Sequence, residues 1–335
     1  MSISIRVRVR VKLRKGGPST GKPALPSLAP DTVLDAIRKV KGEKVAGNDQ
    51  WYEFSDKRFA WSGAFDVITG GNDAPDPDAE RPGRPLFGDD APPTFETVFG
   101  VAHPAQGRRP RGLEGLIVHF DAFRIRAAGN GAEDSDRRSI QMIGSGKANG
   151  FHYLEISRTG KIFLPDRWDW NQWGSHAGKS LCPVTGRTGV SQFYVGAEMN
   201  NPGALFPTAD PNVLVPWFNT VRNSAGVTIT DSKGRATRKS PNDEWYTPQE
   251  ARQIKTKTGN IKPGWYLPYS HDQFEALTNL CLHLARTFSS TFSLDKVLGH
   301  DEVAPTRKND PGGCLANPSD QMTMKDFRTH LRERL

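Results

Sequence analysis

A run rich in proline and acidic residues divides the chain at residues 71–93 (GNDAPDPDAERPGRPLFGDDAPP). It holds six prolines, six acidic residues and few side chains that a core could bury, which is typical of a semi-rigid linker. The boundary between two domains is therefore expected here. We expect a small β module over residues 1–70, a linker over residues 71–95 and a large domain over residues 96–335.

The first segment alternates in character, with apolar residues at odd positions and mostly basic residues at even positions over residues 3–13. A period of two predicts a strand. Its basic face could contact a polyanion, but a solvated outer face or a charge-protected edge strand explains it as well. Shorter strand-like pieces separated by turn residues follow over residues 44–65, so this segment is predicted to be all β.

The motif GNDQWYEFSDKRFAWSGAF at residues 47–65 resembles the bacterial SH3-like domains that accompany cell-wall hydrolases. The resemblance covers about 40 residues and implies a wall-binding module. Trp51 and Trp61 would then either contact the wall or form the core of the small barrel.

The balance of charges favours an anionic partner. The chain has 45 Lys and Arg against 37 Asp and Glu, a formal net charge of +8, which suits nucleic acid, a membrane surface or bacterial cell wall. Three widely spaced cysteines do not form a disulfide framework. No stretch approaches the roughly 18 apolar residues of a membrane span, and residues 1–16 lack the apolar core of a secretory signal. We therefore expect synthesis in the cytoplasm and no membrane insertion.

Strands and helices interleave in the large domain. Apolar runs predict strands at residues 116–120 and 194–199 and a hairpin formed by residues 151–157 and 161–164. A helix is expected from Ser135, as N-cap, to Gly144, and another from Ser270, where Gln273 completes a capping box. The resulting fold class is α/β (α+β), a mixed sheet flanked by helices. The second helix buries one stripe: Phe274, Leu277, Cys281, Leu284 and Phe288.

Three residues could hold a metal ion. His300 follows the apolar Val297 and Leu298, and Asp310 comes ten residues later on a Pro-Gly turn. His119 ends a strand of its own. Zinc accepts imidazole nitrogen and carboxylate oxygen, and a catalytic site needs three protein ligands and one open position. Each histidine alone is equally explained as a hydrogen-bonding residue at a strand end.

Five motifs occur in a fixed order: LIVHF, GFHYLEISRTGKI, GSHAG, VGAEMNN and LGHDEVAPTRKNDPGG. Together they resemble the zinc-dependent N-acetylmuramoyl-L-alanine amidases over residues 112 to about 333. That family includes phage lysozyme-like amidases, anhydro-muropeptide amidases and peptidoglycan recognition proteins. The resemblance implies Zn²⁺ held by His119, His300 and Asp310, where the aspartate takes the place that some relatives give to cysteine. Cys314, four residues beyond, is an alternative ligand, but the spacing of Lys308, Asp310, Pro311 and Gly312 favours the aspartate.

The resemblance also implies the catalytic groups. Zinc lowers the pKa of bound water and polarises the scissile carbonyl, Glu198 acts as the base, and Lys308 stabilises the oxyanion. Phe151 stands where some relatives carry a catalytic tyrosine and cannot donate a proton, which places the proton transfer on Glu198. His152, His176 and Asn200 are the expected substrate-binding residues, although Asn200 could equally satisfy a strand end.

Residues 201–270 form an insertion longer than a simple connection needs. Residues 227–230 and a turn at residues 231–234 predict a hairpin in it. Four aromatic residues in its later part either line a groove or pin the insertion to the body of the domain: Trp245, Tyr246, Trp265 and Tyr266.

The expected function is that of a peptidoglycan hydrolase that cuts between the lactyl group of N-acetylmuramic acid and L-alanine of the stem peptide. The alternative is a recognition protein that binds peptidoglycan without cleaving it. A nucleic-acid partner is not expected, because no nucleic-acid motif follows the basic strand. Acting on the wall or in the periplasm would require phage lysis or export outside the general secretory route. An immunity or secretion partner stays open.

Overall fold

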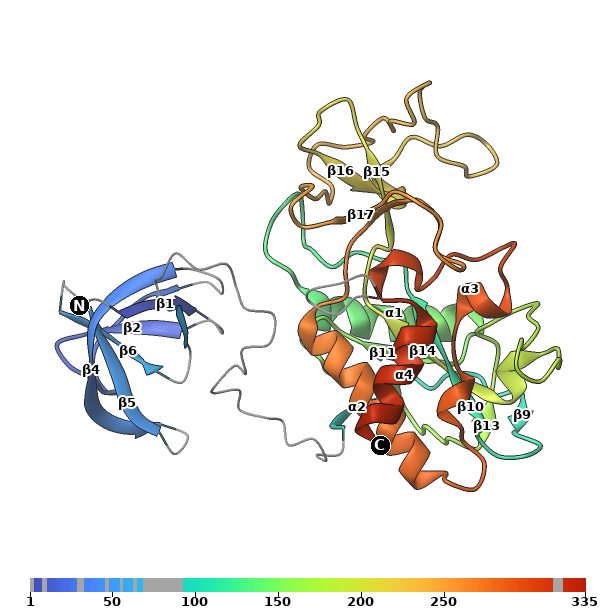
Figure 1. Cartoon of the computed structure of the whole chain (residues 1–335), viewed down its shortest axis with the longest axis horizontal. Coiled ribbons are helices and arrows are strands. Elements are labelled where there is room, and N and C mark those ends of the chain that lie inside the picture. Colours follow the sequence, from blue (N-terminus) through green and yellow to red (C-terminus); the bar gives the residue numbers. More distant parts are fainter. Residues whose placement is uncertain are drawn as a thin grey trace. The chain divides into compact units, whose positions relative to one another are not determined.

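The computed structural model describes residues 3–7, 11–28, 33–45, 48–54, 57–62, 65–68, 93–315 and 322–335. The chain forms two compact units, Met1–Arg84 and Pro85–Leu335. Both units are shown in Figure 1. Most of the predicted linker, residues 71–92, lies outside the described residues.

The smaller unit is a seven-stranded antiparallel sheet in the order β3-β2-β6-β5-β4-β1-β7. The single strand predicted over residues 3–13 is wrong. β1 pairs with β4 and β7, whereas β2 pairs with β3 and β6, so the two pieces have different neighbours. The strands are β1 (Ile3–Val7), β2 (Val11–Lys15), β3 (Ala24–Leu28), β4 (Val33–Val45), β5 (Asn48–Phe54), β6 (Arg58–Trp61) and β7 (Phe65–Ile68).

The alternating pattern nevertheless holds along β2, where Val11 and Leu13 are buried and Lys12 is exposed. Trp51 is 2% exposed, and its indole Nε1 donates to the Glu43 carbonyl oxygen at 2.9 Å. Trp51 is therefore a core residue with a satisfied donor, while Trp61 is partly buried against the same core.

The larger unit is built on a six-stranded mixed sheet in the order β19-β10-β14-β11-β12-β8, and the mixed α+β fold class is confirmed. β10 lies between β14 and β19, and all three run parallel. β11 continues parallel to β14, and β12 turns back antiparallel to β11. The strands are β8 (Phe95–Val98), β10 (Gly115–Phe120), β11 (Leu154–Ile156), β12 (Ile162–Pro165), β14 (Tyr194–Met199) and β19 (Val297–Gly299); β9 (Gly107–Arg108) and β13 (Gln172–Trp173) form a separate pair.

Helices cover both faces of this sheet (Figure 1). Leu116 and Val118 of β10 belong to the core that α2 (His271–Thr287) and α4 (Met324–Arg334) close. On the other face, Ile143 of α1 (Ser135–Asn149) packs with Phe163 of β12. Burial on both faces explains why β10 reads as a continuous apolar run rather than an alternating one. Among the described helices, none has the length and apolar content that a membrane span requires.

Of the two predicted N-caps, the one at Ser270 is confirmed and the one at Ser135 is wrong. Ser270 and Gln273 form the predicted capping box at the start of α2. Asp134, not Ser135, is the N-cap of α1, because the Ser135 hydroxyl donates to Asn200 Oδ1 at 2.6 Å. α1 also runs past Gly144 and ends at Gly150, whose φ of 73° is the left-handed conformation that glycine permits.

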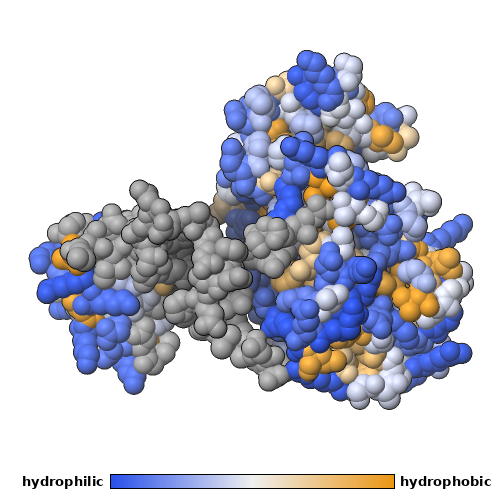
Figure 2. All heavy atoms as spheres, in the orientation of Figure 1, coloured by the Kyte–Doolittle hydropathy of each residue, from blue (hydrophilic) through white to orange (hydrophobic). Residues whose placement is uncertain are grey.

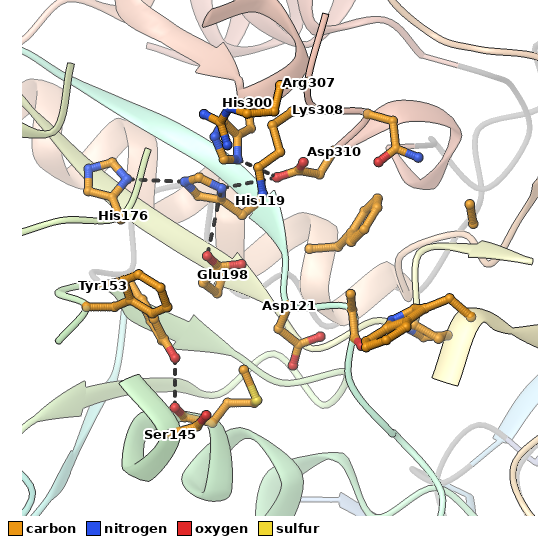
Figure 3. Close-up of a pocket in the computed structure, with 18 of the residues that line it drawn as sticks. His119, Asp121, Ser145, Tyr153, His176, Glu198, His300, Arg307, Lys308 and Asp310 are labelled. Carbon is orange, nitrogen blue, oxygen red and sulfur yellow. Dashed lines mark hydrogen bonds and ion pairs between the residues drawn. The ribbon is translucent and has the colours of Figure 1, made fainter. Parts of the chain in front are cut away.

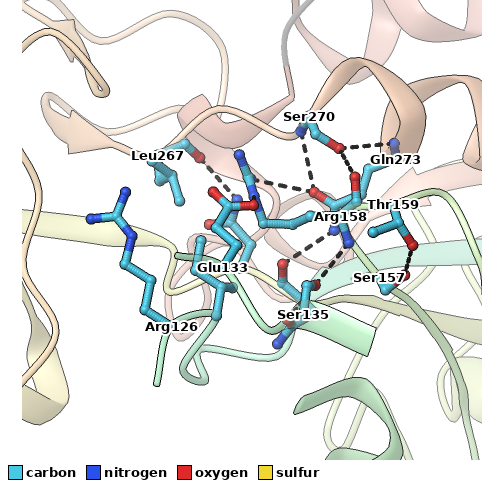
Figure 4. Close-up of polar contacts among 12 residues, drawn as sticks. Arg126, Glu133, Ser135, Ser157, Arg158, Thr159, Leu267, Ser270 and Gln273 are labelled. Carbon is cyan, nitrogen blue, oxygen red and sulfur yellow. Dashed lines mark hydrogen bonds and ion pairs between the residues drawn. The ribbon is translucent and has the colours of Figure 1, made fainter. Parts of the chain in front are cut away.

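The turn of the β11–β12 hairpin joins the starts of both helices (Figure 4). The Arg158 backbone N–H donates to Ser135 Oγ at 2.8 Å, and Ser270 Oγ donates to the Arg158 carbonyl oxygen at 2.5 Å. The Arg158 guanidinium donates to Glu133 at 2.9 Å. The predicted hairpin is confirmed, and its turn fixes the two helices relative to the sheet.

The insertion forms a sheet of its own in the order β16-β15-β18-β17. Its two ends meet, because the Leu267 N–H donates to the Gly203 carbonyl oxygen at 3.2 Å. The predicted turn is present, with the Gly234 N–H donating to Asp231, but residues 227–230 make only isolated bridges. Figure 2 shows hydrophilic and apolar residues interspersed over this part of the surface. The strands are β15 (Ala204–Pro207), β16 (Leu214–Pro216), β17 (Arg252–Ile254) and β18 (Gly264–Tyr266).

Candidate active site

Three parallel strands bring distant residues to one edge of the sheet. His119 near the end of β10 is the register partner of Glu198 on β14. His300 follows Gly299, the last residue of β19, and begins the short helix α3 (His300–Val303). The carboxyl ends of parallel strands are where α/β sheets usually bind ligands, and the three side chains meet there (Figure 3).

Asp310 joins this group from the loop after α3. The Asp301 N–H donates to the Asp310 carbonyl oxygen at 2.7 Å and closes the loop. Asp310 Oδ2 lies 3.1 Å from His119 Nδ1 and 2.9 Å from His300 Nδ1. All three residues are buried, and one ligand atom from each lies within 4.8 Å of the others.

Hydrogen bonds indicate which ring nitrogens of His119, His176 and His300 carry protons. His176 Nε2 lies 2.9 Å from the Tyr194 carbonyl oxygen, which only accepts, so Nε2 carries the proton. Burial and the neighbouring His119 hold the pKa of His176 well below its usual value. The ring is therefore neutral, and its Nδ1 accepts from His119 Nε2 at 3.2 Å.

The same reasoning leaves lone pairs on both Nδ1 atoms. Burial, then His300, lowers the pKa of His119 to about 4, so its proton at neutral pH is the one on Nε2. His300 Nε2 lies 3.2 Å from the Ala177 carbonyl oxygen and donates to it, which makes Nδ1 the ring nitrogen available to a metal ion. Two nitrogen lone pairs and the Asp310 carboxylate thus converge, an arrangement that a cation stabilises and that fits a metal ion.

Cys314 is not part of this group. Its side chain is fully buried, and Sγ lies 3.6 Å from Asn201 Oδ1. The three atoms that converge belong to His119, His300 and Asp310.

Glu198 lies beside the group, with Oε1 3.7 Å from His119 Nδ1. Burial, then the charges of Asp310 and Asp121, raises the pKa of Glu198 well above its usual value. A raised pKa suits a carboxylate that must accept and later return a proton. Lys308 lines the same pocket, two residues before Asp310.

Two further acids lie near Glu198: Asp121, which also lines the pocket, and Glu155. Glu155, on β11, is the register partner of Glu198 and is fully buried. Burial, then Asp121, raises the pKa of Glu155 well above its usual value, and burial raises the pKa of Asp121 to about 6. Asn200 Nδ2 donates to Asp121 Oδ2 at 2.7 Å. Asn200 is fully buried and absent from the pocket lining, so the structure places it beneath the site and not on a substrate-contacting surface.

The two remaining predicted residues, His176 and His152, differ in whether they line the pocket. His176 lines the pocket. His152 does not, because its ring stacks on Trp168 with 4.6 Å between centroids and is 4% exposed. Phe151 lines the pocket, as does Tyr153, whose hydroxyl donates to the Met142 carbonyl oxygen at 2.7 Å.

The pocket has a volume of about 480 Å³. One wall comes from Met142 and Ser145 of α1 and from Phe151, which lies between α1 and β11. Another wall comes from Phe206 and Trp217 of the insertion. Sequence reasoning missed both insertion residues. Of the four aromatic residues it considered there, none lines the pocket, and Tyr246 and Tyr266 are at most 1% exposed.

Comparison with known proteins gives one family. The family model described as N-acetylmuramoyl-L-alanine amidase matches residues 108–313. No curated protein is significantly similar in sequence.

Several solved structures are distantly similar. AmiD from E. coli, solved with the substrate anhydro-N-acetylmuramic acid-L-Ala-D-gamma-Glu-L-Lys, is 17% identical with a TM-score of 0.32, covering 69% of this chain and 60% of its own. The endolysin LysCS from Clostridium intestinale URNW is 14% identical with a TM-score of 0.34, covering 72% and 98%. AmpDh3 from Pseudomonas aeruginosa, in complex with anhydromuramic pentapeptide, is 15% identical with a TM-score of 0.34, covering 70% and 64%.

Proposed function

The chain belongs to the N-acetylmuramoyl-L-alanine amidase family, and from this premise we propose that it hydrolyses the amide between the lactyl group of N-acetylmuramic acid and L-alanine of the peptidoglycan stem peptide. One observation carries the proposal. His119, His300 and Asp310 converge beside Glu198 in a single pocket, although they come from separate parts of the sequence.

The metal in this proposal is zinc, which His119, His300 and Asp310 would hold. Two imidazoles and one carboxylate match the ligand chemistry of catalytic zinc sites. When bound, zinc supplies a water that ionises near neutral pH and polarises a carbonyl oxygen. The contacts of His176 and Ala177 keep the proton off each ligating nitrogen.

Glu198 is the general base in this mechanism. It takes a proton from the attacking water and returns it to the leaving amine of L-alanine. It must be ionised to accept that proton. The Lys308 ammonium, which lines the same pocket, stabilises the negative oxygen of the tetrahedral intermediate.

The second candidate is a recognition protein that binds peptidoglycan without cleaving it. Such a protein is expected to lack part of the metal-binding or proton-transfer set. This chain retains all of those residues in one pocket, which favours the enzyme.

Peptidoglycan is the partner in either case, and the formal charge of +8 favours approach to an anionic wall. We extend the proposal to the smaller unit as an SH3-like wall-binding module, and to the cell wall or periplasm as the place of action. An immunity or secretion partner is compatible with that setting.

The test is to incubate purified peptidoglycan with zinc-loaded protein and to identify the products by mass spectrometry. Stem peptides that begin with free L-alanine, absent when a chelator is added, are the expected result. Binding to peptidoglycan with no new amino terminus would contradict the proposal and support the recognition protein.

A further inference from the structure

Trp217 is a pocket residue to which the amidase reaction assigns no role. It begins the short 3-10 helix η3 (Trp217–Asn219) that follows β16 in the insertion. Its side chain lines the pocket that also contains His119 and Glu198, and the residue is 39% exposed. A large indole left this accessible beside a reaction centre is a candidate contact for substrate.

The indole is held in a defined position. Its Nε1 donates to the Ala122 carbonyl oxygen at 2.9 Å. The Arg222 guanidinium lies 4.7 Å from the ring centroid, as expected for a cation over an aromatic face. Ala122 has a φ of 52°. This left-handed conformation is unfavourable for any residue other than glycine. The hydrogen bond from Trp217 to Ala122 therefore also supports the loop after β10.

The walls of the pocket differ in charge. Arg307 and Lys308 lie on the loop after α3, where they suit the carboxylates of a stem peptide. The insertion contributes only uncharged side chains to the lining: Pro202, Ala204, Phe206 and Trp217. A neutral group with an apolar face fits that wall better than a peptide carboxylate does.

We propose that Trp217 is the platform on which the sugar ring of the muramoyl group packs, and thus a specificity-determining residue for the acyl side of the scissile amide. The inference rests on the proposed function for the identity of the substrate. A pyranose ring presents C–H groups on one face, and these pack against an aromatic face, whereas its hydroxyl and acetamido groups point outward to polar partners. The first residue of the stem peptide, L-alanine, offers a single methyl group and cannot cover an indole.

The test compares two soluble substrates that share the scissile amide. One is N-acetylmuramoyl-L-alanyl-D-isoglutamine, and the other is the lactoyl dipeptide, which lacks the sugar. We expect Trp217→Ala to lower kcat/KM about tenfold for the first, mainly through KM, and to leave the second nearly unchanged. Trp217→Phe should keep most of the preference, because it keeps an aromatic face and removes only the donor to Ala122.

Equal losses on both substrates would overturn the inference, since supporting the Ala122 loop would then be the whole role of Trp217. Unchanged kinetics would overturn it as well. Val227→Ala is the matched control on the insertion, because Val227 is 60% exposed and absent from the pocket lining. Melting curves establish that each variant is folded.

A binding measurement separates this inference from the proposed function. Saturation-transfer NMR with N-acetylmuramic acid as the probe reports contact with the sugar without any cleavage. If the wild-type protein cleaves neither substrate but binds the probe, and Trp217→Ala does not bind it, the amidase proposal fails and the sugar platform stands. If wild type and Trp217→Ala give the same signal, the platform is refuted.

Discussion

Glu198 Oε1 lies 3.7 Å from His119 Nδ1, and the two residues are register partners on neighbouring parallel strands. The pairing of β10 with β14 therefore sets the separation of a candidate base from a candidate metal ligand. A shift of one residue in that pairing would turn one of the two side chains to the opposite face of the sheet.

Replacing Glu198 with glutamine should abolish most activity while preserving the fold. Glutamine has nearly the same shape but cannot accept the proton of the attacking water, and loss of a general base typically costs about 10²- to 10⁴-fold in rate. Release of free L-alanine amino termini from peptidoglycan measures the effect. Glu96→Gln, on the surface at an ion pair with Lys161, is the control. Wild-type rates for Glu198→Gln would exclude it as the base.

Zinc should stabilise the folded protein at one ion per chain. A ligand present at 100 times its Kd adds about 2.7 kcal/mol to the free energy of unfolding, so chelation should lower the melting temperature. His300→Ala should abolish the difference between zinc-loaded and chelated samples. Cys314→Ser should keep both the stoichiometry and the difference, because Cys314 is outside the converging group. Loss of bound zinc in Cys314→Ser would assign the cysteine a ligand role.

His176 should affect zinc affinity although it contributes no atom to the converging group. It accepts the proton of His119 Nε2 and so keeps Nδ1 free. Removing such a support typically weakens metal binding about tenfold or more. We expect that loss for His176→Phe and recovery in His176→Gln, whose side-chain oxygen can accept the same hydrogen bond. Competition with a chromogenic chelator measures Kd, and an unchanged Kd in His176→Phe would contradict the assignment.

Acid should remove the contribution of one partly buried ion-pair cluster, formed by Glu114, Arg187 and Lys296, that is not part of the pocket lining. Glu114 accepts from Arg187 Nη1 and from Lys296 Nζ, both at 2.9 Å. Hydrogen bonds from Arg187, then Lys296, outweigh burial and lower the pKa of Glu114 to about 2. Its ionised form is thus favoured in the folded state, so the contribution is complete above the unfolded pKa of about 4.3 and is lost as the pH falls toward 2.

Chemical unfolding of Glu114→Gln checks this pH dependence. The variant should be about 2 kcal/mol less stable than wild type at pH 7, and the difference should shrink steadily between pH 5 and the folded pKa of about 2. A difference that stays constant over that interval would show that packing, not charge, accounts for the loss.

The sequence was sufficient for features that depend on local pattern or on ordered motifs. The apolar run at residues 116–120 predicts β10, and the capping box at Ser270 predicts the start of α2 because both signals are local. His119, His300 and Asp310 are far apart in the chain, yet each follows or precedes a recognisable strand end or turn. Their motifs predict the group that the structure brings together.

Features that depend on tertiary packing could not be predicted in this way. His152 belongs to a family-like motif, but the direction of its side chain is decided by stacking on Trp168. Ser135 has the chemistry of an N-cap, but its hydroxyl bonds to Asn200 instead. Trp217 enters the pocket only because β15 and β16 pair and turn η3 toward the loop after β10, and no periodic pattern in the insertion indicates that path.

The hydrogen bond between Leu267 and Gly203 closes the base of the insertion. A segment whose two ends already meet can be shortened, lengthened or exchanged without changing the path of the chain on either side. The elements that carry His119, Glu198 and His300, which are β10, β14 and α3, lie outside this closed base. The insertion is nevertheless bonded to the loop after β10, because Arg124 Nη2 donates to Asp243 Oδ2 at 2.7 Å and the Ile125 N–H donates to Glu244 Oε2 at 3.1 Å. An insertion grafted from another amidase would have to keep these contacts for that loop to keep its path.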